Sequence, residues 1–175
     1  MTEQAFIVGT VVANKPGVLH KISNMFRRRS FNIESISVGP TEEKELARMT
    51  ITLLGNEWAA RQLVKQLEKL IDVVSVTVLD QKKTVLRELA LVKIVAADSK
   101  TRSDVIDWAN IFRGQVVDAS PESIIVEVTG TPDKIDAFIE LAKGVGLKET
   151  SRTGVTALER GPRTINSEKR GYLNG

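Results

Sequence analysis

The sequence contains no cysteine and a single histidine, His20, among its 175 residues. Without cysteine the chain cannot form disulfides, thiolate metal sites or a cysteine nucleophile, and one histidine leaves little scope for a histidine-based metal site. His20 lies off the apolar stripe of an expected helix, which favours a surface position over a catalytic one, and the sequence suggests no nucleophile paired with a base. We therefore expect no metal site and no catalytic residue on this chain.

Phosphate-binding motifs and membrane segments are also missing. The sequence has no G-x-x-x-x-G-K-[ST] loop and no G-x-G-x-x-G fingerprint, and its Gly144 and Gly146 are better explained as a helix stop. No apolar run approaches the roughly 20 residues that cross a bilayer. The polar residues 1–4 do not have the charged and apolar regions of a signal peptide. We therefore expect a cytoplasmic protein with no membrane partner.

What the sequence does contain is enough apolar material for a core: 42% of the residues are hydrophobic and 27% are charged, with only 5 prolines. A chain of 175 residues can form two small domains. The net charge is +3, which hints at an anionic partner. The densest basic run, residues 27–29, is explained at least as well by the end of a helix, where cations meet the negative end of the helix dipole.

Hydrophobic periodicity in the first half predicts one βαββαβ unit, complete by about Asp80. The expected elements are a strand at 5–12, a helix at 18–26, strands at 32–38 and 49–53, a helix after Asn56 and a strand at 73–79. Asn56 is expected to cap the second helix. The polar residues 81–83 are the best candidate for a linker.

The same order of elements then repeats. The second set consists of a strand at 86–96, a helix around 105–112, strands at 115–119 and 124–129, a helix around 131–142 and a closing strand within 147–158. We therefore predict an α+β protein of two ferredoxin-like βαββαβ domains in tandem, at 1–80 and 84–160, followed by a polar tail at 161–175 that we expect to be mobile. Unpaired edge strands in such domains favour a dimer.

The turn from Asn14 to Gly17 joins the first strand to the first helix and is a candidate ligand site. Backbone N–H groups at a helix N-terminus bind anions. Gly17 leaves room for a carboxylate, Pro16 fixes the entry to the helix, and the amide of Asn14 can donate and accept hydrogen bonds. The alternative is that this Pro-Gly segment is only a turn, and the residues alone leave both interpretations open.

Six segments together resemble a known family. They are residues 14–19 (NKPGVL), 31–35 (FNIES), 48–51 (RMTI), 88–94 (ELALVKI), 112–118 (FRGQVVD) and 151–155 (SRTGV). In this order they resemble the small regulatory subunits of acetohydroxyacid synthase, also called acetolactate synthase, whose first domain is an ACT domain. The resemblance covers nearly the whole chain except its last dozen or so residues.

The resemblance implies a non-catalytic subunit that activates a large catalytic subunit in branched-chain amino-acid biosynthesis and confers feedback inhibition on it. The thiamine diphosphate, magnesium ion and FAD are then expected on the large subunit, and no cofactor on this chain. The family also implies a homodimer through the ACT domain, with valine or another branched-chain amino acid bound at the dimer interface. The implied effector-binding residues are Asn14, Gly17, Val18 and Leu19 of one chain with Asn32 and Ile33 of the other. Lys15 and Pro16 depart from the acidic or serine-containing turn of some members.

Two other classes of protein are alternatives to this family. An RNA recognition motif has the same βαββαβ order but needs exposed aromatic side chains on its sheet. The strands here carry Ser35, Ser37, Thr50 and Thr52 instead, and aromatic residues total 5%, so we expect no nucleic-acid partner. A free-standing ACT-domain regulator of another process is the remaining alternative, although the segments after Val85 match the acetolactate synthase partner.

Overall fold

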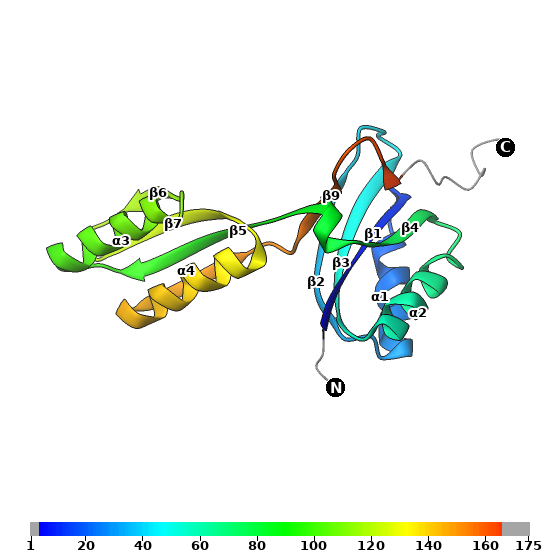
Figure 1. Ribbon diagram of the computed structural model, residues 1–175, viewed down its shortest axis with the longest axis horizontal. Helices are drawn as coiled ribbons and strands as arrows, with labels where there is room; N and C mark the ends of the chain where they lie inside the picture. Colours follow the sequence, from blue (N-terminus) through cyan, green and yellow to red (C-terminus); the bar gives the residue numbers. More distant parts are fainter. Residues whose placement is uncertain (1–3, 166–175) are drawn as a thin grey trace. The chain divides into compact units, whose positions relative to one another are not determined.

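The computed structural model describes residues 4–165, which form two compact α+β units (Figure 1). The first unit combines the chain up to Val85 with the residues from Gly154 onward, and the second runs from Leu86 to Thr153. Each unit has a mainly antiparallel sheet with two helices. The predicted fold class, two βαββαβ domains in tandem, is confirmed.

The first unit follows the predicted order of elements. They are β1 (Gln4–Ala13), α1 (Val18–Arg29), β2 (Ile33–Pro40), β3 (Leu46–Gly55), α2 (Glu57–Leu67) and β4 (Val73–Leu79). The sheet order is β2-β3-β1-β4, with antiparallel pairing throughout. Both central strands, β1 and β3, therefore have partners on two sides, while β2 and β4 are the edges.

One face of this sheet packs against α1 and α2. The buried residues of this core are Val8, Val12, Val18, Ile22, Met25, Phe26, Ala47, Met49, Ile51, Leu53, Ala60, Leu63 and Leu67. Their spacing in the helices is that of a single apolar stripe, which explains why the sequence predicted these helices. Asn56 caps α2 as expected, because its Oδ1 accepts a hydrogen bond of 2.9 Å from the N–H of Ala59.

The opposite face of the sheet, which we call the helix-free face, is covered by the chain from Gly154 to Ile165. Val155, Ala157 and Ile165 are buried there, and Ile165 packs with Val11 and Leu46. The carbonyl of Ala157 accepts a hydrogen bond of 2.9 Å from Nη2 of Arg48 in β3. The face on which an RNA recognition motif would stack bases is therefore occupied by the protein itself.

The second unit contains β5 (Thr84–Val95), α3 (Ser99–Ile111), β6 (Gln115–Ala119), β7 (Ser123–Gly130), α4 (Pro132–Val145) and β8 (Leu147–Arg152). Its sheet order is β6-β7-β5-β8. The short β9 (Thr156–Glu159) belongs to the first unit and pairs with β5, whose first two residues also belong to that unit. The buried core lies between the sheet and the two helices, with Phe138 fully buried and its ring 5.3 Å from that of Phe112 in an edge-to-face arrangement.

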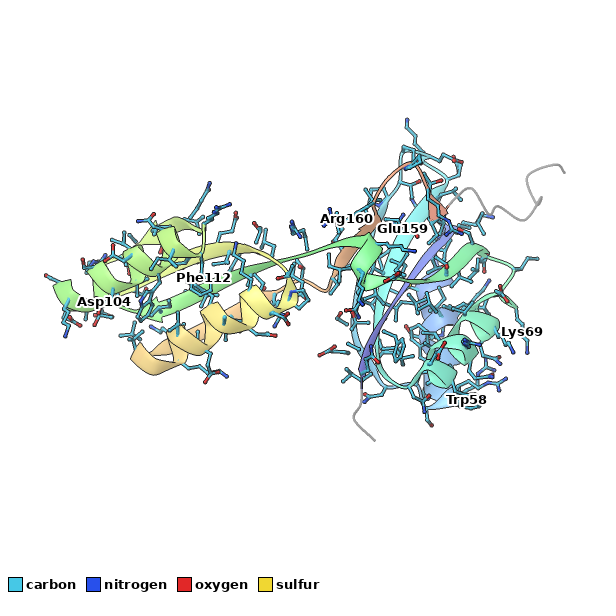
Figure 2. All side chains as sticks on the ribbon, in the orientation of Figure 1. Trp58, Lys69, Asp104, Phe112, Glu159 and Arg160 are labelled. Atoms are coloured by element: carbon cyan, nitrogen blue, oxygen red, sulfur yellow. The ribbon has the colours of Figure 1, made fainter. Side chains whose placement is uncertain are left out.

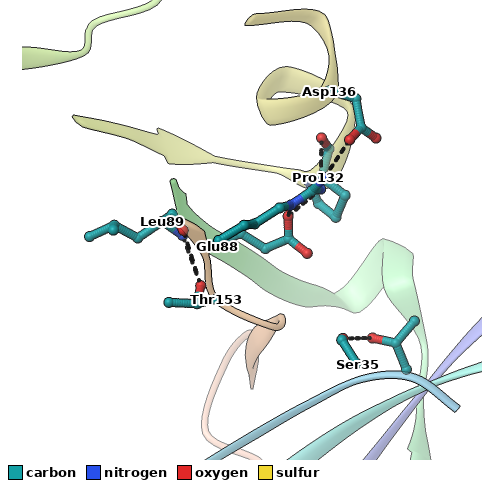
Figure 3. Close-up of polar contacts among 8 residues, drawn as sticks. Ser35, Glu88, Leu89, Pro132, Asp136 and Thr153 are labelled. Carbon is teal, nitrogen blue, oxygen red and sulfur yellow. Dashed lines mark hydrogen bonds and ion pairs between the residues drawn. The ribbon is translucent and has the colours of Figure 1, made fainter. Parts of the chain in front are cut away.

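Arg152, in the family-like segment 151–155, holds three elements of the second unit together through Glu88 and Asp136, both of which are labelled in Figure 3. Its Nε donates a hydrogen bond of 2.7 Å to the buried carboxylate of Glu88 in β5, and its Nη1 donates one of 2.5 Å to Asp136 in α4. Burial acts to lower the pKa of Arg152, but the hydrogen bonds and charges of Glu88 and Asp136 outweigh it and the pKa is raised. The cluster keeps β5, β8 and the start of α4 in register.

The compact second unit is shorter than the domain predicted at 84–160. The closing strand expected within 147–158 is two strands, because β8 ends at Arg152 and the chain then passes to the first unit. Residues 154–160, assigned from sequence to the domain at 84–160, are therefore part of the first unit. The expected linker 81–83 is a short 3-10 helix capped by Asp80. Of the expected mobile tail at 161–175, residues 166–175 lie outside the described residues, while Ile165 is buried.

Candidate ligand site at the start of helix α1

The loop between β1 and α1 has a defined shape. Gly17 adopts a left-handed conformation, with φ 87° and ψ −12°, and it is the N-cap residue of α1. Asn14 is fixed by the loop between β2 and β3, since its N–H donates to the carbonyl of Glu45 at 2.7 Å and its Nδ2 donates to the carbonyl of Lys44 at 3.2 Å. Residues other than glycine rarely adopt such a positive φ, which explains why a glycine occupies this position.

The first turn of α1 offers N–H groups to a ligand. The first intrahelical hydrogen bond runs from the N–H of Lys21 to the carbonyl of Gly17 at 3.0 Å, so the N–H groups of Leu19 and His20 precede the helical ladder. No acidic side chain lies in the first turn and no side chain caps it. The partial positive charge of the helix N-terminus is therefore available to a small anion.

The predicted residues at this end of the sheet differ in what they can contribute. Val18 is buried in the core, and its N–H donates to the carbonyl of Lys15 at 3.4 Å. Leu19 is 49% exposed and offers an apolar side chain next to the N–H groups. Asn14, Gly17 and Leu19 are thus brought together as one polar and apolar surface, while Val18 belongs to the core.

Asn32 and Ile33 lie at the opposite end of the same sheet. Ile33 is paired with Leu53 of β3, whereas the candidate loop follows Ala13, which is paired with Leu46. The seven steps from Leu46 to Leu53 along β3 span about 23 Å at about 3.3 Å per residue. One protomer therefore cannot unite the two groups of predicted residues in a single small-molecule site.

Sequence analysis missed the role of the β2–β3 loop in holding Asn14. Its contacts to Asn14 use the main-chain carbonyls of Lys44 and Glu45, and a main-chain contact leaves no signal in residue type. The lone histidine has the expected surface position, with its Nε2 2.8 Å from Nδ2 of Asn24. Within residues 4–165 no three His, Asp or Glu side chains are grouped so that they could hold a metal ion, and no helix in that range is long and apolar enough to cross a membrane.

Two family models match the chain. Residues 9–75 match the AHAS small subunit-like ACT domain, and residues 87–161 match the family described as the small subunit of acetolactate synthase. The second match extends past Thr153, where the compact second unit ends. Residues 154–161 of the segment that covers the helix-free face of the first sheet are therefore part of the family's second sequence region.

Several individual proteins are similar over most of the chain. The acetolactate synthase small subunit of Mycolicibacterium smegmatis is 43% identical over 162 residues, which cover 93% of this chain and 95% of the relative. That of Aquifex aeolicus is 46% identical over 154 residues, covering 88% of this chain and 80% of the relative. The crystal structure of the acetolactate synthase small subunit from Thermotoga maritima superposes with a TM-score of 0.84 at 38% identity, covering 91% of this chain and 99% of that one. The chain belongs to the acetolactate synthase small-subunit family.

Proposed function

We propose that this chain is a regulatory subunit that activates the large catalytic subunit of acetolactate synthase and makes it sensitive to valine or another branched-chain amino acid. Family membership supports the regulatory role. The observation that supports amino-acid sensing is the open N-terminus of α1 beside the exposed Leu19. In this proposal the thiamine diphosphate, magnesium and FAD belong to the large subunit, and the complex acts in the cytoplasm in branched-chain amino-acid biosynthesis.

A homodimer through the first unit would complete the effector site. Strand β2 is an edge of its sheet and, within the described residues, pairs only with β3. If β2 pairs antiparallel with the same strand of a second chain, the Ile33 end of one strand lies beside the Pro40 end of the other. The Pro40 end is level with Val12 of β1, next to the candidate loop. The pairing thus moves Asn32 of the partner subunit toward Asn14 and Gly17, across a distance that one chain cannot bridge.

The chemistry of this composite site fits an aliphatic amino acid. The carboxylate binds the N–H groups at the start of α1, and the amides of Asn14 and of Asn32 of the partner subunit orient it or receive the ammonium group. Leu19 and the partner's Ile33 contact the aliphatic side chain. Each dimer contains two such sites, because the two-fold axis repeats the arrangement.

Reconstitution with the cognate large subunit tests the proposal. The purified chain with all cofactors is expected to form no acetolactate, to raise the activity of the large subunit when mixed with it, and to make that activity sensitive to valine, leucine or isoleucine. Asn32→Ala is expected to weaken inhibition about tenfold to a hundredfold at equal activation, since it removes one hydrogen bond to a charged group. Acetolactate formation by the chain alone, or an unchanged large subunit after mixing, contradicts the proposal.

The second candidate function, a free-standing amino-acid-responsive regulator of another process, predicts a different partner. Affinity purification of the chain from its native cells separates the two. Recovery of a thiamine-diphosphate-dependent enzyme supports the acetolactate synthase role, and recovery of the chain without that enzyme supports the alternative.

A further inference from the structure

A cavity of about 330 Å³ lies on the helix-free face of the first sheet. Its walls come from β1, β3, the β2–β3 loop and the covering segment 158–165. All of these belong to the first unit. The volume is at the lower end of the range for small-molecule pockets, so it suits a compact ligand.

Arg48 is the side chain in this cavity whose hydrogen bonds are incomplete. Its Nη2 donates to the carbonyl of Ala157 at 2.9 Å, but its buried Nε has no acceptor among the described residues. Burial lowers the pKa of this guanidinium, against the charges of Glu159 and Glu42, which raise it. A buried N–H without an acceptor is unfavourable, and an anionic oxygen is the partner that a guanidinium binds most strongly.

The other lining side chains indicate the shape and charge of the ligand. Leu158 and Ile165 supply apolar surface, and Arg163 adds a second guanidinium to the lining. Glu42 and Glu159, the latter labelled in Figure 2, supply negative charge near Arg48. A carboxylate beside Arg48 with a short aliphatic body therefore matches the lining. An ammonium group on the same molecule is favoured by the two glutamates.

The cavity is also connected to the loop before α1. Thr41 and Glu42 of the β2–β3 loop line the cavity, and the same loop binds Asn14 through the carbonyls of Lys44 and Glu45. A ligand that moves or orders this loop changes the position of Asn14. The cavity and the loop before α1 thus both contact the β2–β3 loop.

We propose that this cavity is a second small-molecule site, which binds a small aliphatic carboxylate, preferably an amino acid, through Arg48 and communicates with the loop before α1 through the β2–β3 loop. The site is separate from the effector site at the N-terminus of α1 and does not depend on the proposed function. It lies within one protomer, so it needs no dimer to be complete.

The test uses the full chain carrying Gly17→Asp, which blocks the site at α1, and follows backbone amide shifts in isotope-labelled protein. The probes are L-leucine, isocaproate, which lacks the ammonium group, and isoamylamine, which lacks the carboxylate. We expect saturable shifts at Gly39, Gly161 and Asn14 with leucine and isocaproate and none with isoamylamine. Tighter binding of leucine than of isocaproate identifies the natural ligand as an amino acid, and equal binding identifies a simple carboxylate.

Two variants locate the binding. Leu158 is 62% exposed, so Leu158→Trp fills the cavity without removing a buried side chain and should abolish the shifts. Leu141→Trp, on an exposed leucine of α4, is the matched control and should leave them unchanged. Arg48→Met should weaken binding about tenfold to a hundredfold, with partial recovery in Arg48→Lys.

Three results overturn the proposal. They are the absence of saturable shifts with both carboxylates, retention of the shifts in Leu158→Trp, and binding of isoamylamine as tight as that of leucine. Because none of these measurements uses the large subunit, they stand apart from the outcome of the reconstitution assay.

Discussion

Replacing Gly17 by aspartate tests the effector site most directly, because it adds a negative charge where the carboxylate of the effector is expected. Gly17 has a φ of +87° and open space where a Cβ would point. The substitution therefore has two effects that must be separated. One is backbone strain of about 1 to 2 kcal/mol from a left-handed L-residue, and the other is repulsion of the ligand.

Gly17→Asn separates them, since asparagine has nearly the same shape as aspartate, tolerates the left-handed conformation and carries no charge. Two like charges about 5 Å apart at an effective dielectric constant of about 20 repel by about 3 kcal/mol. This corresponds to about a hundredfold loss of affinity. We therefore expect Gly17→Asp to raise the inhibitory concentration of valine about a hundredfold above that of Gly17→Asn.

The assay measures acetolactate formation by the reconstituted enzyme against valine concentration, with each variant added at a concentration that gives equal activation. Equal activation shows that the variants fold and bind the large subunit. If Gly17→Asp and Gly17→Asn give the same inhibition curve as the wild type, no carboxylate binds at the start of α1 and the site is misplaced. If both variants lose inhibition equally, the backbone conformation matters and the charge does not, which refutes the electrostatic argument.

Three further predictions concern stability and are measured by chemical denaturation. Arg152→Met should destabilise the second unit by about 3 kcal/mol, because it leaves the carboxylate of Glu88 buried without a partner. Asp136→Asn should cost less than about 1 kcal/mol, because the Asp136 side chain is 62% exposed. Equal losses of unfolding free energy in the two variants would contradict this assignment. Ile165→Ala should destabilise the first unit by about 2 kcal/mol through the cavity it creates, and an unchanged midpoint would show that the covering segment does not stabilise the sheet. Asn56→Ala should cost about 1 kcal/mol through loss of the α2 cap, with Asn56→Asp close to the wild type.

The helices and strands of both units, and their order along the chain, could be predicted from the sequence. Each helix or strand repeats its apolar residues at one regular spacing. Ile22, Met25 and Phe26 form such a stripe in α1, and all are buried in the structure. Asn56 was predicted as a cap for the same kind of local reason, since its side chain bonds the backbone three residues ahead. The α1 loop was also found from sequence, because glycine and proline restrict the backbone locally.

The role of residues 154–165 could not be predicted, because a single buried side chain such as Ile165 in a polar segment has no period. The finding changes the design of truncated chains. A chain that ends at Gln81 lacks the segment that covers Val11 and Leu46, so we expect it to be less stable than the first unit of the full chain. The pairing of Arg152 with Glu88, which are 64 residues apart in sequence, was hidden for the same reason.

The two βαββαβ units, the Asn56 cap, the loop at Gly17 and, through six matching segments, the family could all be predicted from the sequence. These features depend on local preference and on spacing along the chain. Two other findings required the folded structure. Residues 154–165 belong to the first unit, and Asn32 and Ile33 lie about seven residues along β3 from the loop they were predicted to assist. Such placements follow from strand register and from contacts between distant residues, because the free energy of a packed surface depends on which segments meet and the sequence of each segment alone does not specify its partner.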